Sequence, residues 1–239
     1  MSGPARPSLV VSEIFGPTVS GEGPTLGQRC SFLRLGGCNL TCTWCDSAWT
    51  WDASRHDLRA ELTRMGAETV VGRLLDTGVR FVIVSGGEPL LQQGYPGWGA
   101  VLRGLTGAGV RVEVETNGTV EPTGESVRLL ARFIVSPKLG HSGVARERRI
   151  NGPALKALAA TGKAVFKVVC RDADDVAEAE EELVAAHGIP ARRVWVMPEG
   201  TDSATLSRHL AAIADPAVAA GFNVTTRLHV HAWGDERGR

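Results

Sequence analysis

Three of the five cysteines of this chain, Cys38, Cys42 and Cys45, stand in one short segment with the spacing C-x3-C-x2-C. Thiolates are the protein ligands of iron–sulfur clusters, and in a reducing compartment crowded thiols indicate metal binding or catalysis rather than disulfides. A cubane cluster has four irons, so three cysteines would bind three of them and leave the fourth for another ligand. The segment therefore predicts a [4Fe–4S] cluster with one open iron.

Two other interpretations of the same segment are open. A structural zinc site would need a fourth Cys or His, and His56 is the candidate. The C-x2-C pair of Cys42 and Cys45 could instead be a redox pair. The redox interpretation leaves Cys38 without a role, and the zinc interpretation gives no role to the polar loops described next.

The elements around this segment alternate between strands and helices. Strands rich in Val, Ile and Phe are expected over residues 30–35, 81–85, 110–115, 133–136, 164–169, 194–197 and 227–231. Helices are expected over residues 68–77, 98–108, 152–161, 172–187 and 203–214. This alternation predicts an α/β fold with a parallel sheet. The other two cysteines, Cys30 and Cys170, lie in apolar strand segments and are expected to be buried thiols.

Glycine-rich and polar loops follow five of the expected strands. They read GGCNLTCTWCD, GGEP, TNGT, PKLGHS and PEG, in chain order. Because the carboxyl ends of parallel strands lie at one edge of a sheet, where α/β folds place their sites, these loops are expected to form one pocket.

The cysteine spacing, with Trp44 before the last cysteine, and the SGGEP segment of residues 85–89 resemble the signature of the radical S-adenosylmethionine superfamily. The resemblance implies that the amino and carboxylate groups of S-adenosylmethionine chelate the open iron. One electron from the reduced cluster would then yield a 5′-deoxyadenosyl radical. Glu88 can accept a hydrogen bond from the cofactor's ammonium group, and glycines allow a close backbone approach.

The flanking segments are more specific. Together they resemble the 7-carboxy-7-deazaguanine synthase family over nearly the whole chain, in residues 13–25 (EIFGPTVSGEGPT), 45–52 (CDSAWTWD), 115–119 (ETNGT), 136–138 (SPK) and 227–238 (RLHVHAWGDERG). The resemblance implies a radical ring contraction of 6-carboxy-5,6,7,8-tetrahydropterin to 7-carboxy-7-deazaguanine with loss of ammonia. It also implies a single radical SAM domain over residues 1–239, folded as a partial or modified (β/α) barrel with the cluster loop at residues 36–48. The end product stays open between tRNA queuosine, a DNA modification and a deazapurine natural product.

Site residues carry over from the resemblance where the motifs match. For S-adenosylmethionine they are Trp44, Asp46, Glu88, Gly118, Ser136, Lys138, Met197, Pro198, Glu199 and Gly200. For the substrate they are Val19, Ser20, Gly21, Glu22, Arg34 and Thr116. The planar guanidinium of Arg34 suits a carboxylate, although a structural ion pair is the alternative. Ser47 stands where the family has a threonine that binds Mg²⁺, and serine keeps the hydroxyl oxygen.

Three histidines are left without an assigned role. His229 and His231 stand two residues apart on the expected last strand, which would place both on one face, either near the barrel mouth or in a catalytic role. His141 lies in a loop and is equally open.

The composition excludes some partners. The chain has 239 residues with 26 basic and 26 acidic side chains, so its overall charge favours neither nucleic acid nor an anionic membrane. No segment approaches the ~20 apolar residues that cross a bilayer, and the first residues lack the pattern of a signal peptide, so a cytoplasmic location is expected. The family resemblance adds a homodimer and an electron donor such as flavodoxin or ferredoxin.

Three rival functions are weighed against this one. A glycyl-radical-enzyme activating enzyme would share the cluster motif, but residues 13–25 and the WGDERG tail argue against it. A non-catalytic zinc- or cluster-binding module is the rival from another class. A plain α/β domain with chance motifs would have to match five loops in order.

Overall fold

A computed structural model describes residues 7–239 and divides them into two compact units. The first unit contains residues 7–17, Cys30–Thr116 and Pro122–Phe133, and the second contains Thr18–Arg29, Asn117–Glu121 and Ile134–Arg239. The single domain over residues 1–239 stays a prediction. The expectation that the chain begins without a signal peptide falls partly on residues 1–6, which lie outside the described residues.

The first unit is built on strands in the order β3-β1-β2-β4-β5. They are β1 (Ser8–Val19), β2 (Arg29–Leu35), β3 (Thr63–Gly66), β4 (Phe81–Gly86) and β5 (Arg111–Thr116), with the last two residues of β1 and the first of β2 belonging to the second unit. β3 is antiparallel to β1, whereas β2, β4 and β5 are parallel, with Arg34 opposite Ser85. Val82 and Val112 in the middle strands are fully buried, as expected of a parallel sheet.

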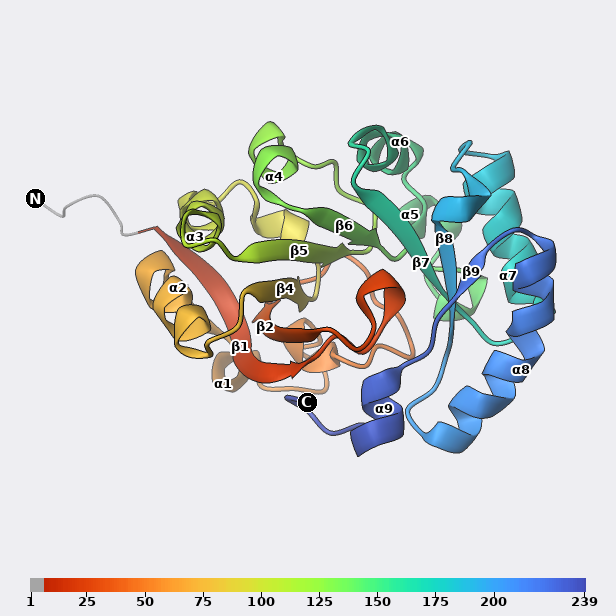
Figure 1. Ribbon diagram of the computed structural model, residues 1–239, viewed down its shortest axis with the longest axis horizontal. Coiled ribbons are helices and arrows are strands. Elements are labelled where there is room, and N and C mark those ends of the chain that lie inside the picture. The colour runs from red at the N-terminus through yellow and green to blue at the C-terminus, as the bar shows by residue number, and fades with distance from the viewer. Residues whose placement is uncertain (1–6) are drawn as a thin grey trace, which may run out of the picture. The chain divides into compact units, whose positions relative to one another are not determined.

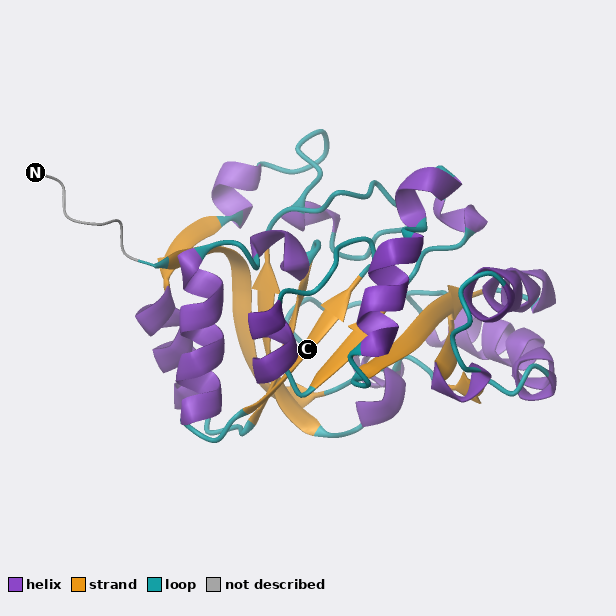
Figure 2. Ribbon diagram, turned by 90° about the horizontal axis from the view of Figure 1, so that it is seen from above, coloured by secondary structure: helices purple, strands orange, loops and turns teal. Residues whose placement is uncertain are grey.

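Helices α2 (Ala67–Asp76) and α3 (Pro96–Gly107) lie next to each other beside this sheet (Figure 1, Figure 2). Their buried apolar residues include Leu74 and Leu105. The shorter helices of the unit are α1 (Leu58–Glu61) and α4 (Gly124–Leu129), each begun by a side-chain cap, from Asp57 and Thr123. Single 3₁₀ turns cover Ala48–Thr50 and Pro89–Gln92.

The second unit contains the parallel strands β7 (Ala164–Cys170), β8 (Val194–Pro198) and β9 (Asn223–Val224), in that order. Strand β6 (Arg132–Val135) divides between the two units after Phe133. The helices are α5 (Arg146–Arg149), α6 (Gly152–Ala160), α7 (Ala173–Ala179), α8 (Ser203–Ala219) and α9 (Leu228–Trp233), and Figure 1 shows α7 and α8 next to each other. 3₁₀ turns cover Gly23–Thr25, Gly140–Ser142 and Ala191–Arg193.

Six of the seven expected strands are confirmed to within one or two residues. The expected strand at residues 227–231 is wrong, because this segment forms helix α9 instead. Val230 is its one buried residue among residues 228–233, and Gly234 ends the helix with a φ of 71°. His229 and His231 therefore do not share a strand face, since positions two apart on a helix point in different directions. Strands β1, β3 and β9 were not predicted.

The expected helices are confirmed, with one change of form. Residues 172–187 begin as an α-helix capped by Asp172, whose carboxylate accepts from the Asp175 N–H at 3.0 Å. The second half, Glu180–Ala185, winds as a π-helix, and Gly188 then turns the chain with a φ of 67°. No helix within residues 7–239 is long and apolar enough to span a membrane.

Candidate active site

The cluster loop at residues 36–48 follows β2 in the first unit and is held at its beginning by backbone hydrogen bonds. Gly36 N–H donates to the Val10 carbonyl at 3.0 Å, and Gly37 N–H donates to the Thr50 carbonyl at 2.8 Å. The loop has no regular strand or helix before the turn at residue 48. It is therefore shaped by its contacts with β1 and with the turn that follows it.

The sulfurs of Cys38 and Cys45 receive hydrogen bonds. Leu40 N–H donates to Cys38 Sγ at 3.4 Å, and the indole Nε1–H of Trp51 donates to Cys45 Sγ at 3.3 Å. Cys42 is buried, at 7% exposure. Such donors favour thiolates over thiols, and thiolates are what a cluster binds. The donor set of this loop thus fits a [4Fe–4S] cluster.

The surroundings of Cys38 change the pKa of its thiol. Burial raises its pKa to about 11, and the carboxylate of Glu88 and the thiols of Cys45 and Cys42 add to the rise, while the Leu40 N–H opposes it. A metal cluster would have to displace the proton of this thiol, because the thiolate is the ligand that it binds. Among residues 7–239, no group of three or more His, Cys, Asp or Glu side chains is placed so that it could hold a single metal ion.

The Gly86-Gly87-Glu88 segment at the end of β4 lies directly against the cluster loop. Glu88 N–H donates to the Gly37 carbonyl at 2.8 Å, and Gly87 N–H donates to the Leu35 carbonyl at 3.1 Å. A Cβ on Gly87 would overlap the Gly37 carbonyl, so the two backbones can meet only because residue 87 is glycine. The backbone that Gly87 brings close is therefore that of the cluster loop, at Gly37.

Two residues predicted for different ligands meet in this unit. The carboxylate of Glu88 is fully buried, and its Oε1 accepts from Leu90 N–H at 2.9 Å and from the Thr116 hydroxyl at 2.8 Å. Glu88 was predicted for S-adenosylmethionine and Thr116 for the substrate. Their contact places the loops after β4 and β5 side by side.

Arg34 forms the ion pair that was the alternative to its substrate role. Its Nε lies 2.6 Å from Glu13 Oε1, and both side chains are largely buried. The guanidinium also lies 5.7 Å from the ring centre of Phe15 and 5.8 Å from that of Trp49, within cation–π range. Glu13 was not predicted as a site residue, although it begins the EIF segment that carries the resemblance. An arginine held by one carboxylate through Nε can still present its other nitrogens to a second carboxylate.

Ser47 is buried, with its hydroxyl 3.8 Å from Cys45 Sγ. It begins the turn Ala48–Thr50, but among the described residues its side chain caps no backbone N–H. A serine at this position could simply cap the following turn, and the structure shows no such cap among the residues it describes. Nearby residues of the loop are more exposed than Ser47: Asp46 is exposed and Trp44 is half-buried. A buried hydroxyl that does not cap the turn fits the chemistry of a Mg²⁺ ligand.

In the second unit, Glu22 lies between two cations. Its carboxylate pairs with Lys167 Nζ, and its Oε1 lies 3.0 Å from Arg227 Nε. Burial alone would raise the pKa of Glu22, but the charges of Lys167, Arg227 and His229 outweigh it and hold this pKa well below the usual range. Lys167 and Arg227 were missed from sequence; a lysine inside the apolar run AVFKVV was the available signal for the first.

The residues before Glu22 are also held within this unit. Ser20 is buried and its hydroxyl lies 2.9 Å from that of Thr25, and the Gly21 carbonyl accepts from Leu228 N–H at 2.8 Å. A Cβ on Gly21 would overlap the ring of His229, so helix α9 packs directly on this segment. Val19 is half-buried.

The loops after β5 and β6 meet in the second unit. Gly118 has a φ of 80°, and a Cβ there would lie 2.8 Å from Val135. Lys138 Nζ donates to the Ser136 hydroxyl at 2.9 Å. The two residues predicted from the Ser-Pro-Lys turn thus contact each other.

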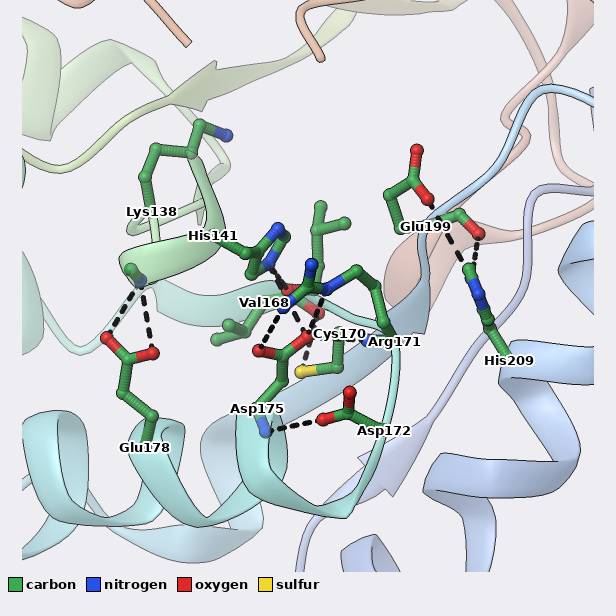
Figure 3. A network of polar contacts seen from close by, with 12 residues as sticks. Lys138, His141, Val168, Cys170, Arg171, Asp172, Asp175, Glu178, Glu199 and His209 are labelled. Atoms are coloured by element: carbon green, nitrogen blue, oxygen red, sulfur yellow. Dashed lines mark hydrogen bonds and ion pairs between the residues drawn. The ribbon is translucent and has the colours of Figure 1, made fainter. Parts of the chain in front are cut away.

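His141 lies in a polar network next to this turn (Figure 3). Its Nε2 lies 3.0 Å from the Val169 carbonyl and 3.7 Å from Asp175, whose carboxylate also accepts from Arg171. These contacts join the loop after β6 to helix α7. They support a structural role for this histidine.

The end of strand β8 and the loop that follows it contain the last predicted residues. Met197 is buried and Pro198 ends the strand. The Glu199 carbonyl accepts from His209 Nδ1 at 2.7 Å, and the Gly200 carbonyl accepts from Arg227 Nη1 at 2.8 Å. Arg227 therefore connects this loop to Glu22.

Comparison with known proteins gives the family. Residues 33–163 match the model of the Radical SAM superfamily. The chain is 40% identical to 7-carboxy-7-deazaguanine synthase of Pyrobaculum aerophilum over 238 residues, covering 98% of this chain and 99% of that protein. It is 32% identical to the Bacillus subtilis protein of the same name, covering 96% and 98%. The crystal structure of QueE from Escherichia coli aligns with a TM-score of 0.68 at 23% identity, over 93% of this chain and 95% of that one, which confirms the expected fold. The chain belongs to the 7-carboxy-7-deazaguanine synthase family of the radical SAM superfamily.

Proposed function

We propose that this protein converts 6-carboxy-5,6,7,8-tetrahydropterin to 7-carboxy-7-deazaguanine with loss of ammonia, as a carbon–nitrogen lyase of 7-deazapurine biosynthesis. The observation that carries the proposal is the cluster loop. Its sulfurs receive N–H donors from Leu40 and Trp51, and the glycines of the GGEP segment bring Glu88 against it. Family membership over nearly the whole chain supports the reaction assigned to that loop.

When bound, the cluster and S-adenosylmethionine supply the 5′-deoxyadenosyl radical that begins the reaction. The protein's part is to hold the groups and orient them. Cys38, Cys42 and Cys45 would bind three irons, and the buried carboxylate of Glu88 would accept from the cofactor's ammonium group. Thr116 orients Glu88 by donating to the same oxygen that caps Leu90.

The remaining residues proposed for S-adenosylmethionine divide between the units. Trp44 and Asp46 belong to the cluster loop, and Gly118, Ser136, Lys138, Met197, Pro198, Glu199 and Gly200 belong to the second unit. The positive φ of Gly118 supports a close backbone approach, because other residues rarely adopt it.

For the substrate we propose two charged groups of opposite sign. Arg34, oriented by Glu13, would bind the carboxylate of the pterin. Glu22, kept ionised by Lys167 and Arg227, is a strong acceptor for ring N–H groups. Thr116 and the backbone of Val19, Ser20 and Gly21 complete the proposed contacts.

Mg²⁺ would be held by Ser47 together with substrate oxygens. A single neutral oxygen is a weak ligand, so the ion is expected to bind together with the substrate carboxylate. A homodimer and reduction by a flavodoxin or ferredoxin follow from the family resemblance, and a cytoplasmic location completes the proposal.

The test is a reconstituted assay. The protein is loaded with iron and sulfide under anaerobic conditions and incubated with the tetrahydropterin, S-adenosylmethionine, Mg²⁺ and a reductant, and products are followed by mass. Formation of 7-carboxy-7-deazaguanine, absent in Cys42→Ala, is expected. Cleavage of S-adenosylmethionine without the deazaguanine would instead favour an activating enzyme with a protein substrate, and loading with zinc alone would favour a binding module.

A further inference from the structure

Trp51 lies outside the cysteine segment, yet its side chain reaches the cluster loop. The indole Nε1–H donates to Cys45 Sγ at 3.3 Å, across six positions of the chain. Neither the cysteine spacing nor the proposed ligand set assigns Trp51 a role. The contact is between a neutral ring donor and an atom that would be an iron ligand.

The turn between Cys45 and Trp51 explains how the indole ring reaches the Cys45 sulfur. Thr50 N–H donates to the Ser47 carbonyl at 2.9 Å, and Trp51 N–H donates to the Ala48 carbonyl at 3.0 Å, so the chain reverses direction after Cys45. The hydroxyl of Thr50 adds a bond of 2.7 Å to the Ser47 carbonyl. The Thr50 carbonyl accepts from Gly37 N–H, which fastens the turn to the beginning of the cluster loop. The position of the indole is thus set by the backbone.

We propose that Trp51 is a positioning and tuning residue of the cluster, whose N–H bond to Cys45 Sγ raises the reduction potential of the [4Fe–4S] centre. Reduction adds one electron, which an external donor supplies, and part of the added negative charge lies on the cysteine sulfurs. A hydrogen-bond donor stabilises that more negative form, and hydrogen bonds to sulfur are among the factors that set cluster potentials. The inference rests on the cluster-binding part of the proposed function.

The local charges make such a donor useful. Glu88 is fully buried and its N–H donates to the Gly37 carbonyl, directly before Cys38, and Asp46 follows Cys45 directly. Negative charge near the cluster lowers its potential and makes reduction harder. The indole N–H raises the reduction potential without adding a charge. Its bond to Cys45 comes from a side chain and can be removed by substitution, whereas the bond from Leu40 to Cys38 comes from the backbone.

The test measures the midpoint potential of the reconstituted cluster by redox titration with spectroscopic detection. Trp51→Phe removes the N–H and keeps an aromatic ring. A second variant places benzothienylalanine at position 51, which keeps the size of the indole and replaces its N–H by sulfur. Trp49→Phe, in the same turn, is the matched control, because the Trp49 ring lies against Arg34.

We expect both position-51 variants to bind iron and sulfide at the parent stoichiometry, with a midpoint potential more negative than that of the parent. The electron paramagnetic resonance signal of the reduced cluster should also change, while Trp49→Phe keeps the parent potential. An unchanged potential in the benzothienylalanine variant would overturn the inference, and so would loss of the cluster in that variant, since Trp51 would then be structural. A parent protein that assembles no cluster would instead overturn the proposed function.

Discussion

The side-chain amide of Gln92 pairs with the backbone of Val10 in both directions. Its Oε1 accepts from Val10 N–H at 2.8 Å, and its Nε2 donates to the Val10 carbonyl at 2.9 Å. The same Nε2 donates to the Gly36 carbonyl at 3.0 Å. The amide thereby joins the turn after the GGEP segment to strand β1 and to the beginning of the cluster loop.

Gln92→Glu is therefore expected to be costly although it changes almost no volume. A carboxylate cannot donate, so the Gly36 carbonyl would lose the amide donor and face a negative charge, while the Val10 carbonyl would keep its bond from Gly36 N–H. A buried group left without its partner costs about 1–3 kcal/mol, so a loss of that size in the free energy of unfolding is expected. Urea unfolding measures it. Gln93→Glu is the control, because Gln93 accepts from Thr123 N–H through an oxygen that glutamate keeps.

Cysteine substitutions should separate cluster ligands from buried thiols. Cys38→Ala, Cys42→Ala and Cys45→Ala are each expected to lose the visible spectrum of the cluster and all turnover. Cys30→Ala and Cys170→Ala should keep both at a cost of roughly 1 kcal/mol in stability, because both thiols are fully buried and burial raises their pKa. A cluster that survived Cys38→Ala and was lost in Cys30→Ala would contradict the ligand assignment.

Arg34→Lys should weaken use of the pterin more than cleavage of S-adenosylmethionine. An ammonium cannot bind two carboxylates in the fixed geometry of a guanidinium. Losing one hydrogen bond to a charged group costs about 1.5–3 kcal/mol, which corresponds to roughly 10- to 150-fold in kcat/KM for the pterin. Glu13→Gln, which keeps the arginine and weakens its ion pair, should show a smaller loss. Equal losses in both variants would mean that Arg34 serves the ion pair alone.

Ser47→Ala tests the proposed Mg²⁺ ligand. Removing the hydroxyl should abolish most of the stimulation by Mg²⁺, whereas Ser47→Thr keeps the oxygen and should stay active. Metal affinity is measured from turnover at several Mg²⁺ concentrations, with and without saturating substrate, and should rise with substrate. Parent-like Mg²⁺ dependence in Ser47→Ala would remove Ser47 from the site.

The cations around Glu22 predict a pH dependence of stability. Because the pKa of Glu22 is held below its usual range, its pairing stabilises the fold above the unfolded-state pKa, and this contribution is lost as the pH falls toward the folded-state value. Lys167→Met should cost about 3–5 kcal/mol near pH 7, since it leaves a buried carboxylate with one cation fewer. The difference between parent and variant, followed by circular dichroism during urea unfolding, should shrink on acidification below the ordinary glutamate range. A difference independent of pH would show that Lys167 acts through packing alone.

Local sequence patterns were enough to predict the parallel strands and the position of the cluster loop. Strands such as β4 and β7 are short apolar runs whose burial follows from their composition, and the three cysteines lie so close in sequence that their spacing predicts the group they bind. The glycines of residues 86–87 could also be assigned to a close approach, though not the partner that they approach.

The features that could not be predicted from the sequence depend on contacts between residues far apart in the chain. The tail at residues 227–231 alternates like a strand, yet it forms helix α9 packed on Gly21. Glu22 meets Lys167 and Arg227 across 145 and 205 positions, and Arg34 meets Glu13 from a neighbouring strand. Charge pairs and packing of this kind are decided by which surfaces the fold buries together. The sequence by itself therefore determined the strand pattern and predicted the cluster ligands, whereas only the tertiary structure decided the partners of the charged residues, because long-range burial leaves no local periodicity to read.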